Sequence, residues 1–423
     1  MADYDIFQQI YVQAFAADLM SVVSGSEWAL QLAFSWAVKK AIAILNKQSP
    51  PDWAVQWGPR LFKDNTLGSA GLDNAWFISF ASGVKYLDGS SFDTYVLSIA
   101  GTAVVSKADW LIQDFKVQEV VDFSAWIKLW GKDSIPPPTP ATDVSTGGPF
   151  VAYGTSFGVY NLVSQPQTRD DKDPTNTIIK FITGLQPGKK TRLVVTGHSL
   201  GGALAPYLSL ALAQSGLLDP NIELLVVPAA GATPGDEAFS TMYSQKFPTR
   251  REANKSYQAW SADFYNTLDI VPQAFQAIKG ADRSLYNIPN IYGIITEPIT
   301  VQKVLLPVAA GIGLGVLSGI KYFPIDGNAF TGPKPSGIPD SFTAFMLEAV
   351  KQHVLAYTDE IGITSLVSQV YHELFKDKQV RPVNLVEATQ RFPVLRQAQA
   401  HRQLPEGSKE VYPYDDLFKG KKA

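Results

Sequence analysis

The residues of this chain that could do chemistry centre on one serine. Gly197-His-Ser-Leu-Gly201 fits the pattern G-x-S-x-G, with Ser199 in the middle. Residues 192–196 are mostly apolar or β-branched, which predicts a short buried strand, and the Ala-rich segment after the motif predicts a helix that Gly216 can cap. Strand, sharp turn and helix together form a nucleophile elbow, which lifts a serine Oγ clear of the sheet. The alternative is a glycine-rich turn with an incidental serine, and Pro206 should kink the expected helix.

A serine hydroxyl is a weak nucleophile and needs a general base, usually a histidine held by a carboxylate. The chain has four histidines, at positions 198, 353, 372 and 401. His198 lies in the motif itself and cannot reach around to Ser199, and His401 lies in a polar tail. His353 stands in a mostly apolar run, whereas His372 stands in a charged segment typical of a surface helix. We therefore favour His353 as the base and keep His372 as the alternative.

The carboxylate should follow a later strand, because these residues occur in the order Ser, acid, His in α/β-hydrolases. Residues 256–265 have the pattern of a strand, and Asp269 follows it in a loop that Pro272 terminates. Asp263 is the competing candidate, but it lies inside the predicted strand. A carboxylate near a strand end is also common as a turn former, so position alone makes Asp269 a modest candidate.

The negative oxygen that forms during acyl transfer needs two hydrogen-bond donors. The backbone N–H of Leu200, directly after the serine, is one candidate. The second should lie in a loop after an earlier strand, and Gly101-Thr102 follows the strand predicted at 95–100. The Thr102 hydroxyl is a further possible donor.

Composition excludes several other kinds of protein. The chain has 423 residues, of which 46% are hydrophobic and 18% charged, as in ordinary globular proteins with a large core. A net charge of −3 gives no reason to expect nucleic-acid binding. The absence of cysteine excludes disulfides, thiolate metal sites and a cysteine nucleophile. No metal or organic cofactor is implied.

Predicted strands alternate with helix-length segments, which indicates a mostly parallel sheet flanked by helices. Besides the two strands already named, we expect strands at 75–80 and 222–227. We divide the chain into an N-terminal helical extension at 1–65, a main domain at 66–375 with insertions near 118–148 and 276–335, and a polar tail at 376–423.

The first residues, Met1-Ala-Asp-Tyr-Asp, are acidic where a secretory signal would be basic. We expect no classical signal peptide, so the compartment stays open between the cytoplasm and export by a non-classical route.

Taken in order, these motifs over about residues 74–358 resemble the class 3 lipases, a family that includes fungal triacylglycerol lipases. The resemblance implies an α/β-hydrolase fold and hydrolysis of carboxylic esters. It places Ser199 as nucleophile, Asp269 as acid, His353 as base and Thr102 at the oxyanion position. It also places residues 106–115 at the family's lid helix, with Trp110 as its tryptophan. Ala100 stands where many members have arginine, and the segment between Asp269 and His353 is longer than usual.

Residues 304–320 form an uncharged, glycine-rich run of nearly transmembrane length. A single span here would put the acid and the base in different compartments, so we expect no integral membrane span. Either the run, with Leu314 and Leu317, lines or covers the acyl site together with the helix around Trp110, or it is a core helix remote from Ser199.

The sequence therefore predicts a serine ester hydrolase that cleaves apolar acyl esters such as triacylglycerols through an acyl-enzyme. Its partner would be a lipid substrate at a lipid–water interface. The alternatives are a phospholipase A1 and a non-catalytic protein with a lipase-like fold.

Overall fold

The computed structural model describes residues 4–63, 73–101, 116–167, 173, 175–376 and 381–382. The helices are α1 (Ile6–Asp18), α2 (Glu27–Gln48), α3 (Phe123–Ile127), α4 (Tyr153–Ser164), α5 (Ile178–Thr183), α6 (Leu200–Ser215), α7 (Glu237–Lys246), α8 (Pro298–Leu317), α9 (Phe342–Val350), α10 (Ala356–Ile361) and α11 (Thr364–Lys376). Two 3-10 segments, η1 (Leu19–Val22) and η4 (Leu285–Asn290), and one π-helical turn, η5 (Lys351–Leu355), join them.

The strands are β1 (Val23–Ser24), β2 (Ala54–Phe62), β3 (Asn74–Lys85), β4 (Ser91–Ile99), β5 (Val120–Asp122), β6 (Phe150–Ala152), β7 (Thr191–His198), β8 (Ile222–Ala229), β9 (Arg250–Arg251), β10 (Ala259–Trp260), β11 (Asp263–Asn266), β12 (Gly327–Phe330) and β13 (Arg381–Pro382). The main sheet has the order β12-β11-β8-β7-β4-β3-β2. The strands from β12 to β4 are parallel, and β3 and β2 continue the sheet antiparallel. The expectation of a mostly parallel sheet is confirmed.

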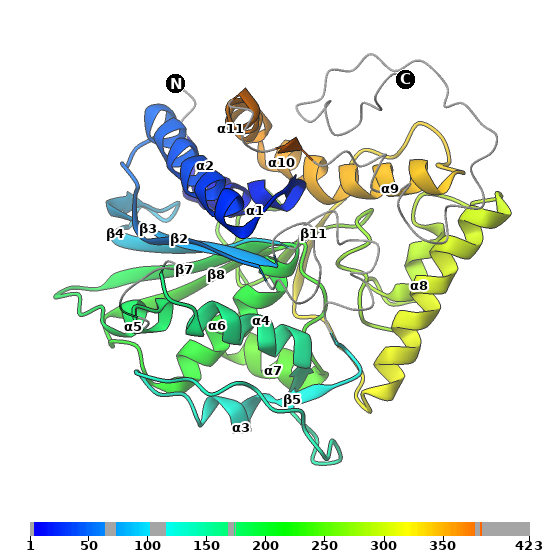
Figure 1. Cartoon of the computed structure of the whole chain (residues 1–423), viewed down its shortest axis with the longest axis horizontal. Helices are drawn as coiled ribbons and strands as arrows, with labels where there is room; N and C mark the ends of the chain where they lie inside the picture. Colours follow the sequence, from blue (N-terminus) through cyan, green and yellow to red (C-terminus); the bar gives the residue numbers. More distant parts are fainter. Residues whose placement is uncertain are drawn as a thin grey trace.

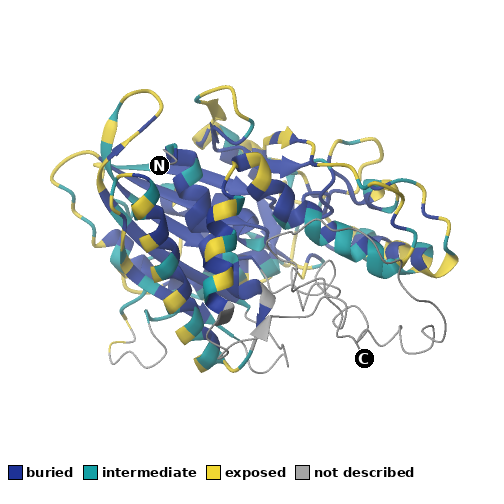
Figure 2. Cartoon of the chain, turned by 90° about the horizontal axis from the view of Figure 1, so that it is seen from above, coloured by how far each residue is buried: buried dark blue, intermediate teal, exposed yellow. Residues whose placement is uncertain are grey.

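Helices cover both faces of this sheet (Figure 1). Along the central strand β7, Leu193 and Val195 point into a core shared with α3 to α7, whereas Val194 points into a core shared with α1, α2, α10 and α11. This alternation follows from the two-residue period of a strand. Figure 2 shows the result, with buried residues concentrated in the centre and exposed residues on outer helix faces and loops.

The N-terminal helices form where the sequence predicts them and pack on the sheet. Asp5 and Gln8 cap the start of α1 reciprocally, and Ser26 caps α2. The predicted extension at 1–65 also contains β2, which is the edge strand of the main sheet. The extension and the main domain therefore share one sheet and one core.

The strand predicted at 256–265 is wrong in extent. Only Asp263–Asn266 joins the main sheet, and Ala259–Trp260 pairs with β9 in a separate ribbon. Ser261, with φ of 67°, turns the chain between them, and a local strand pattern does not reveal such a turn. The helix α6 continues through Pro206 and ends at Gly216, which has left-handed backbone angles as predicted.

The segment between the candidate acid and base is long because it builds structure of its own. It contains η4, α8, β12 and α9, and β12 adds a parallel strand beside β11. The predicted insertion at 276–335 thus includes part of the main sheet. Most of the predicted tail, residues 377–380 and 383–423, lies outside the described residues.

The packing of α2 on the sheet predicts that two aromatic residues of this helix differ in their contribution to stability. Phe34 is fully buried against Phe77 of β3, whereas Trp28 is 68% exposed. Phe34→Ala should lower the free energy of unfolding by about 3–5 kcal/mol, and Trp28→Ala should change it by less than about 0.5 kcal/mol. Denaturant unfolding of both variants measures this, and equal losses would contradict the packing.

Candidate active site

Ser199 occupies a strained turn between β7 and α6. Its backbone angles, φ 62° and ψ −123°, are rare for a residue with a side chain. Two glycines make the turn sterically possible. A Cβ atom on Gly201 would lie 2.1 Å from the Ile99 carbonyl oxygen, and one on Gly197 would lie 2.5 Å from the Gly201 backbone. The predicted strand, turn and helix around Ser199 therefore occur in the structure.

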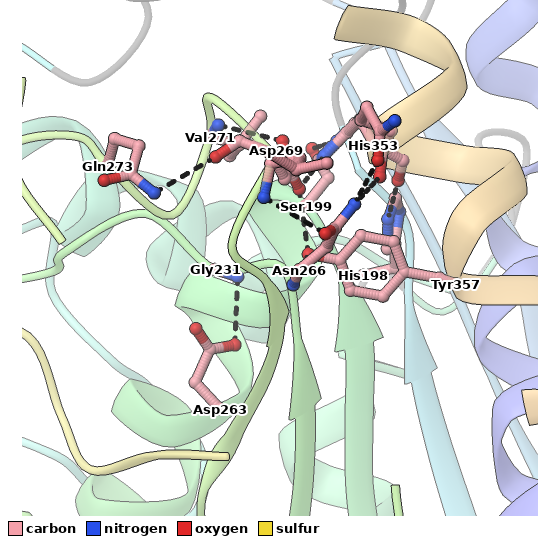
Figure 3. A network of polar contacts seen from close by, with 12 residues as sticks. His198, Ser199, Gly231, Asp263, Asn266, Asp269, Val271, Gln273, His353 and Tyr357 are labelled. Carbon is pink, nitrogen blue, oxygen red and sulfur yellow. Dashed lines mark hydrogen bonds and ion pairs between the residues drawn. The ribbon is translucent and has the colours of Figure 1, made fainter. Parts of the chain in front are cut away.

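Three polar side chains from distant parts of the sequence meet at this turn (Figure 3). The Nε2 atom of His353 lies 2.8 Å from Ser199 Oγ, and its Nδ1 atom lies 2.7 Å from Asp269 Oδ2. Ser199 and His353 are each 4% exposed, and Asp269 is fully buried. In this geometry His353 can accept the serine proton while Asp269 holds the opposite side of the ring.

Further donors surround the Asp269 carboxylate. The backbone N–H of Val271 donates to its Oδ1 atom at 3.0 Å, and the Tyr357 hydroxyl donates to Oδ2 at 2.9 Å. Burial raises the pKa of Tyr357 well above its usual range, and the charge of Asp269 raises it further. The phenol therefore keeps its proton and acts as a donor. These contacts fix both oxygens of Asp269 while one of them faces His353.

Asn266 connects the loop of Asp269 to the segment of His353. Its side-chain amide donates to the Gln352 carbonyl oxygen at 3.0 Å and to Gln352 Oε1 at 2.7 Å. Its side-chain oxygen accepts from the N–H groups of Leu268 and Gly332. These buried hydrogen bonds fix the position of the Asp269 loop relative to the segment of His353. The hydrogen bond between Asp269 and His353 depends on that position.

His353 lies in the π-helical turn η5, between α9 and α10. A π turn holds one more residue than an α turn and often occurs at functional sites. Gln352 and His353 are both buried, and each contacts a residue of the loop at 266–269. The apolar run around His353 predicted burial, but it carried no signal for the π turn or for the role of Gln352.

The competing carboxylate, Asp263, has different partners. Its Oδ2 atom lies 3.1 Å from the Arg283 guanidinium, and its Oδ1 atom accepts from the Gly231 N–H at 3.0 Å. Burial raises the pKa of Asp263 to about 6, against the lowering effect of Arg283. This carboxylate belongs to a buried ion pair and does not contact His353.

Of the other candidate residues, some lie in the part of the chain that the structure describes and some lie outside it. His372 is exposed on α11, and Leu200 follows Ser199 as the first residue of α6. Gly101 is described, whereas Thr102, Trp110 and His401 lie outside the described residues.

His198 does not face Ser199 Oγ, because its ring nitrogens contact Asp18 and the carbonyl oxygen of His353. No feature of the sequence around Asp18 predicted that contact.

The glycine-rich run forms the C-terminal part of α8 and is not a buried core helix. The inner residues Val304 and Val308 join an apolar cluster that includes Val271 and Phe345, and Leu314 packs at its margin. The outer residue Leu317 is 73% exposed. Among the described helices, α2 and α8 are long and apolar enough to cross a membrane, with 44% and 22% of the respective apolar window buried, and neither establishes a span.

Comparisons with known proteins bear on both family and fold. The family model for lipases of class 3 matches residues 175–278. A solved structure of M37 lipase superposes with a TM-score of 0.61 at 21% identity and covers 88% of this chain and 99% of its own. The Yarrowia lipolytica LIP2 lipase and lipase II from Rhizopus niveus, both 17% identical, cover 64% and 63% of this chain and 76% and 74% of their own, with TM-scores of 0.38 and 0.35.

The curated proteins include no match to the chain. The M37 lipase comparison confirms the predicted α/β-hydrolase fold, and the family model confirms the resemblance to class 3 lipases over residues that include Ser199 and Asp269.

The two carboxylates of the β11 region should respond differently to the same substitution. Asp269→Asn should lower kcat for ester hydrolysis by about 10³–10⁴-fold with little change in stability. Asp263→Asn leaves the buried Arg283 charge without its counter-ion and should cost about 3–5 kcal/mol of stability. Thermal unfolding and kcat per titrated active site measure both effects. A stable but inactive Asp263→Asn variant would instead point to Asp263 as the acid.

Proposed function

Residues 175–278 match the class 3 lipase family, which supports a hydrolase of the lipase type. We propose that the chain cleaves carboxylic esters with Ser199 as nucleophile, His353 as base and Asp269 as the orienting acid. The observation that carries the proposal is the buried chain of two hydrogen bonds from Ser199 through His353 to Asp269. No metal or organic cofactor takes part.

The proposed reaction uses the two contacts of the His353 ring, one to Ser199 Oγ and one to Asp269 Oδ2. The Ser199 oxygen attacks the ester carbonyl carbon while its proton passes to Nε2 of His353. The N–H of Leu200, at the start of α6, and Thr102 stabilise the resulting oxyanion. The C–O bond to the alcohol then breaks, and the alcohol leaves with the proton from His353. Water then gives a proton to His353 and attacks the acyl carbon, the bond from that carbon to Ser199 Oγ breaks, and His353 returns the proton to Oγ as the acid leaves.

The apolar cluster beside the site supports an apolar acyl group in the substrate. It contains Val271, directly after the loop of the acid, and Phe345, on the helix that leads to the base. Leu200, next to the nucleophile, packs at its margin. Residues near Ser199 and Asp269 in the chain and a residue of the helix before His353 thus share one apolar cluster, which suits a fatty acyl chain and not a charged substrate.

The α8 helix borders the same cluster and supports a role as a cover of the acyl site. Ser199 and His353 are almost completely buried, so a substrate reaches them only when covering segments move. The inner face of α8 packs on the cluster, and its outer face carries exposed Leu306, Val316 and Leu317. We expect this outer face to meet the lipid–water interface where triacylglycerols are available; Trp110, predicted to share this role, lies outside the described residues.

Two alternatives differ in what they would hydrolyse. A phospholipase A1 would use the same three residues on phospholipids, and a non-catalytic lipase-like protein would hydrolyse no ester. The complete Ser-His-Asp arrangement favours an enzyme. A substrate panel of acyl p-nitrophenyl esters, triacylglycerols and phospholipids distinguishes the three.

Removal of the proposed nucleophile or base should abolish hydrolysis. Ser199→Ala and His353→Ala should each lower kcat by several orders of magnitude, because the three residues act as a unit. His372→Ala is the matched control and should keep wild-type activity, since His372 is exposed on α11. The measurement is p-nitrophenyl butyrate turnover with circular dichroism as a check on folding. An inactive His372→Ala beside an active His353→Ala would reverse the assignment of the base.

The proposed role of α8 predicts a dependence on the physical state of the substrate. Leu317→Asp places a charge on the outer face of α8 and should lower the rate on emulsified long-chain triacylglycerols about tenfold or more, while turnover of soluble short-chain esters stays near wild type. Leu129→Asp is the control, because Leu129 is also exposed, at 61%, but follows α3, which lies below the sheet and away from α8 (Figure 1). Parallel losses on both substrates, or equal effects of the two variants, would refute a covering role.

A further inference from the structure

A second pair of an aspartate and a histidine lies behind the candidate active site. The Oδ2 atom of Asp18, the last residue of α1, lies 2.6 Å from Nδ1 of His198. On the other side of the ring, Nε2 lies 2.7 Å from the carbonyl oxygen of His353. The other carboxylate oxygen of Asp18 accepts a hydrogen bond from the Gly101 N–H. His198 is fully buried and Asp18 nearly so.

The partners determine where the protons lie. A carbonyl oxygen only accepts, so Nε2 of His198 carries a hydrogen and donates it to His353. At Nδ1 a second proton lies between the ring and the Asp18 carboxylate. Charge-assisted hydrogen bonds of this kind are shorter and stronger than neutral ones. The ring is also confined by packing, with centroids 4.8 Å from Phe15 and 4.5 Å from His353.

These contacts join three segments that meet at Ser199. His198 is the residue before the nucleophile, His353 is the proposed base, and Gly101 ends the described part of the chain before Thr102. Gly101 lies directly against the nucleophile, since a Cβ atom on it would be 2.7 Å from Ser199 Cβ. One carboxylate from α1 therefore holds Gly101, just after β4, and, through His198, the backbone of the proposed base.

The position of Asp18 within α1 is unfavourable for the helix itself. The C-terminal end of a helix carries a partial negative charge, which disfavours an acidic residue there. Asp18 therefore does not serve the stability of α1 as Asp5 does at the opposite end, where it caps the helix. Its hydrogen bonds to His198 and Gly101 lead to the active site.

We propose that Asp18 is a positioning residue of the active site, which acts through His198 on the backbone of His353 and directly on Gly101. This inference rests on the proposed function, because the geometry that Asp18 fixes is that of Ser199 and His353. The helix α1 lies outside the residues that match the lipase family model. Under this proposal it nevertheless helps to position the active site.

The test compares three substitutions in α1. Asp18→Ala should lower kcat on a soluble short-chain ester about tenfold to a hundredfold, the range for a small misplacement of catalytic groups, with KM nearly unchanged. Asp18→Asn should recover most of kcat, because its amide can donate to Nδ1 of His198 and accept from Gly101. Asp5→Ala removes the cap at the other end of the same helix. The Asp5 side chain hydrogen-bonds to Gln8, Tyr257 and Gln258, away from Ser199, so this variant controls for loss of stability.

Hydrogen exchange at the Gly101 amide gives a readout that does not depend on catalysis. Exchange should accelerate in Asp18→Ala and not in Asp5→Ala. Wild-type kcat in Asp18→Ala, or equal losses of kcat in Asp18→Ala and Asp5→Ala at equal loss of Tm, would overturn the inference.

If Asp18→Ala does not fold, His198→Phe takes its place, since it keeps the ring and deletes both hydrogen bonds. It should show the same loss of kcat, and wild-type kcat in this variant would also overturn the inference. A wild-type protein that neither hydrolyses esters nor reacts at Ser199 with a fluorophosphonate would overturn the proposed function, and this inference with it. If the wild type is active, a negative result with these variants counts against the role of Asp18 and not against the proposed function.

Discussion

The close approach of backbones at the Ser199 turn is the constraint on which the rest of the structure depends. The first turn of α6 lies against the ends of β4 and β8 with no side chain between them. A Cβ atom on Gly202 would lie 2.1 Å from the Ala229 carbonyl oxygen, as one on Gly201 would from Ile99. This contact sets Ser199 in its strained conformation at the edge of the sheet where the parallel strands β4, β7, β8 and β11 end. Asp269 follows β11 at this edge and contacts His353 of η5, whose ring reaches Ser199 Oγ.

Two buried carboxylates near β11 show how partners decide the role of a residue. Asp263, the first residue of the strand, contacts a permanent cation, so its charge is balanced and it is unavailable to a histidine. Asp269, beyond the end of the strand, receives neutral donors from Val271 and Tyr357, and among its hydrogen-bond partners in the described residues His353 is the one that can become positively charged. Such an environment stabilises the imidazolium that forms during general base catalysis.

The predictable part of this site is the part that local sequence encodes. The elbow needs glycine, a strand and a helix within a short stretch, and the order of Ser199, Asp269 and His353 follows from the fold that the elbow implies. Other features depend on long-range packing and left no local signal. The π turn of His353, the ribbon that shortens the strand before Asp263, and the contact between Asp18 and His198 are of this kind. The strand β12 was also hidden, because its four residues begin with Gly327 and Asn328, which are typical of turns and uncommon in strands.

The residues that match the lipase family model contain Ser199 and Asp269, the proposed nucleophile and acid, but not His353, the proposed base. His353 reaches the site from a helix far along the chain, and its ring and backbone are held separately. Asp269 contacts the ring, whereas His198 contacts the backbone carbonyl, and His198 in turn depends on Asp18. A histidine that shuttles a proton must return to the same position in each cycle, which a single contact to its ring does not ensure because the ring can pivot about it. Two contacts at opposite ends of the residue remove that freedom, and under our proposal the N-terminal helix α1 provides one of them through Asp18 and His198.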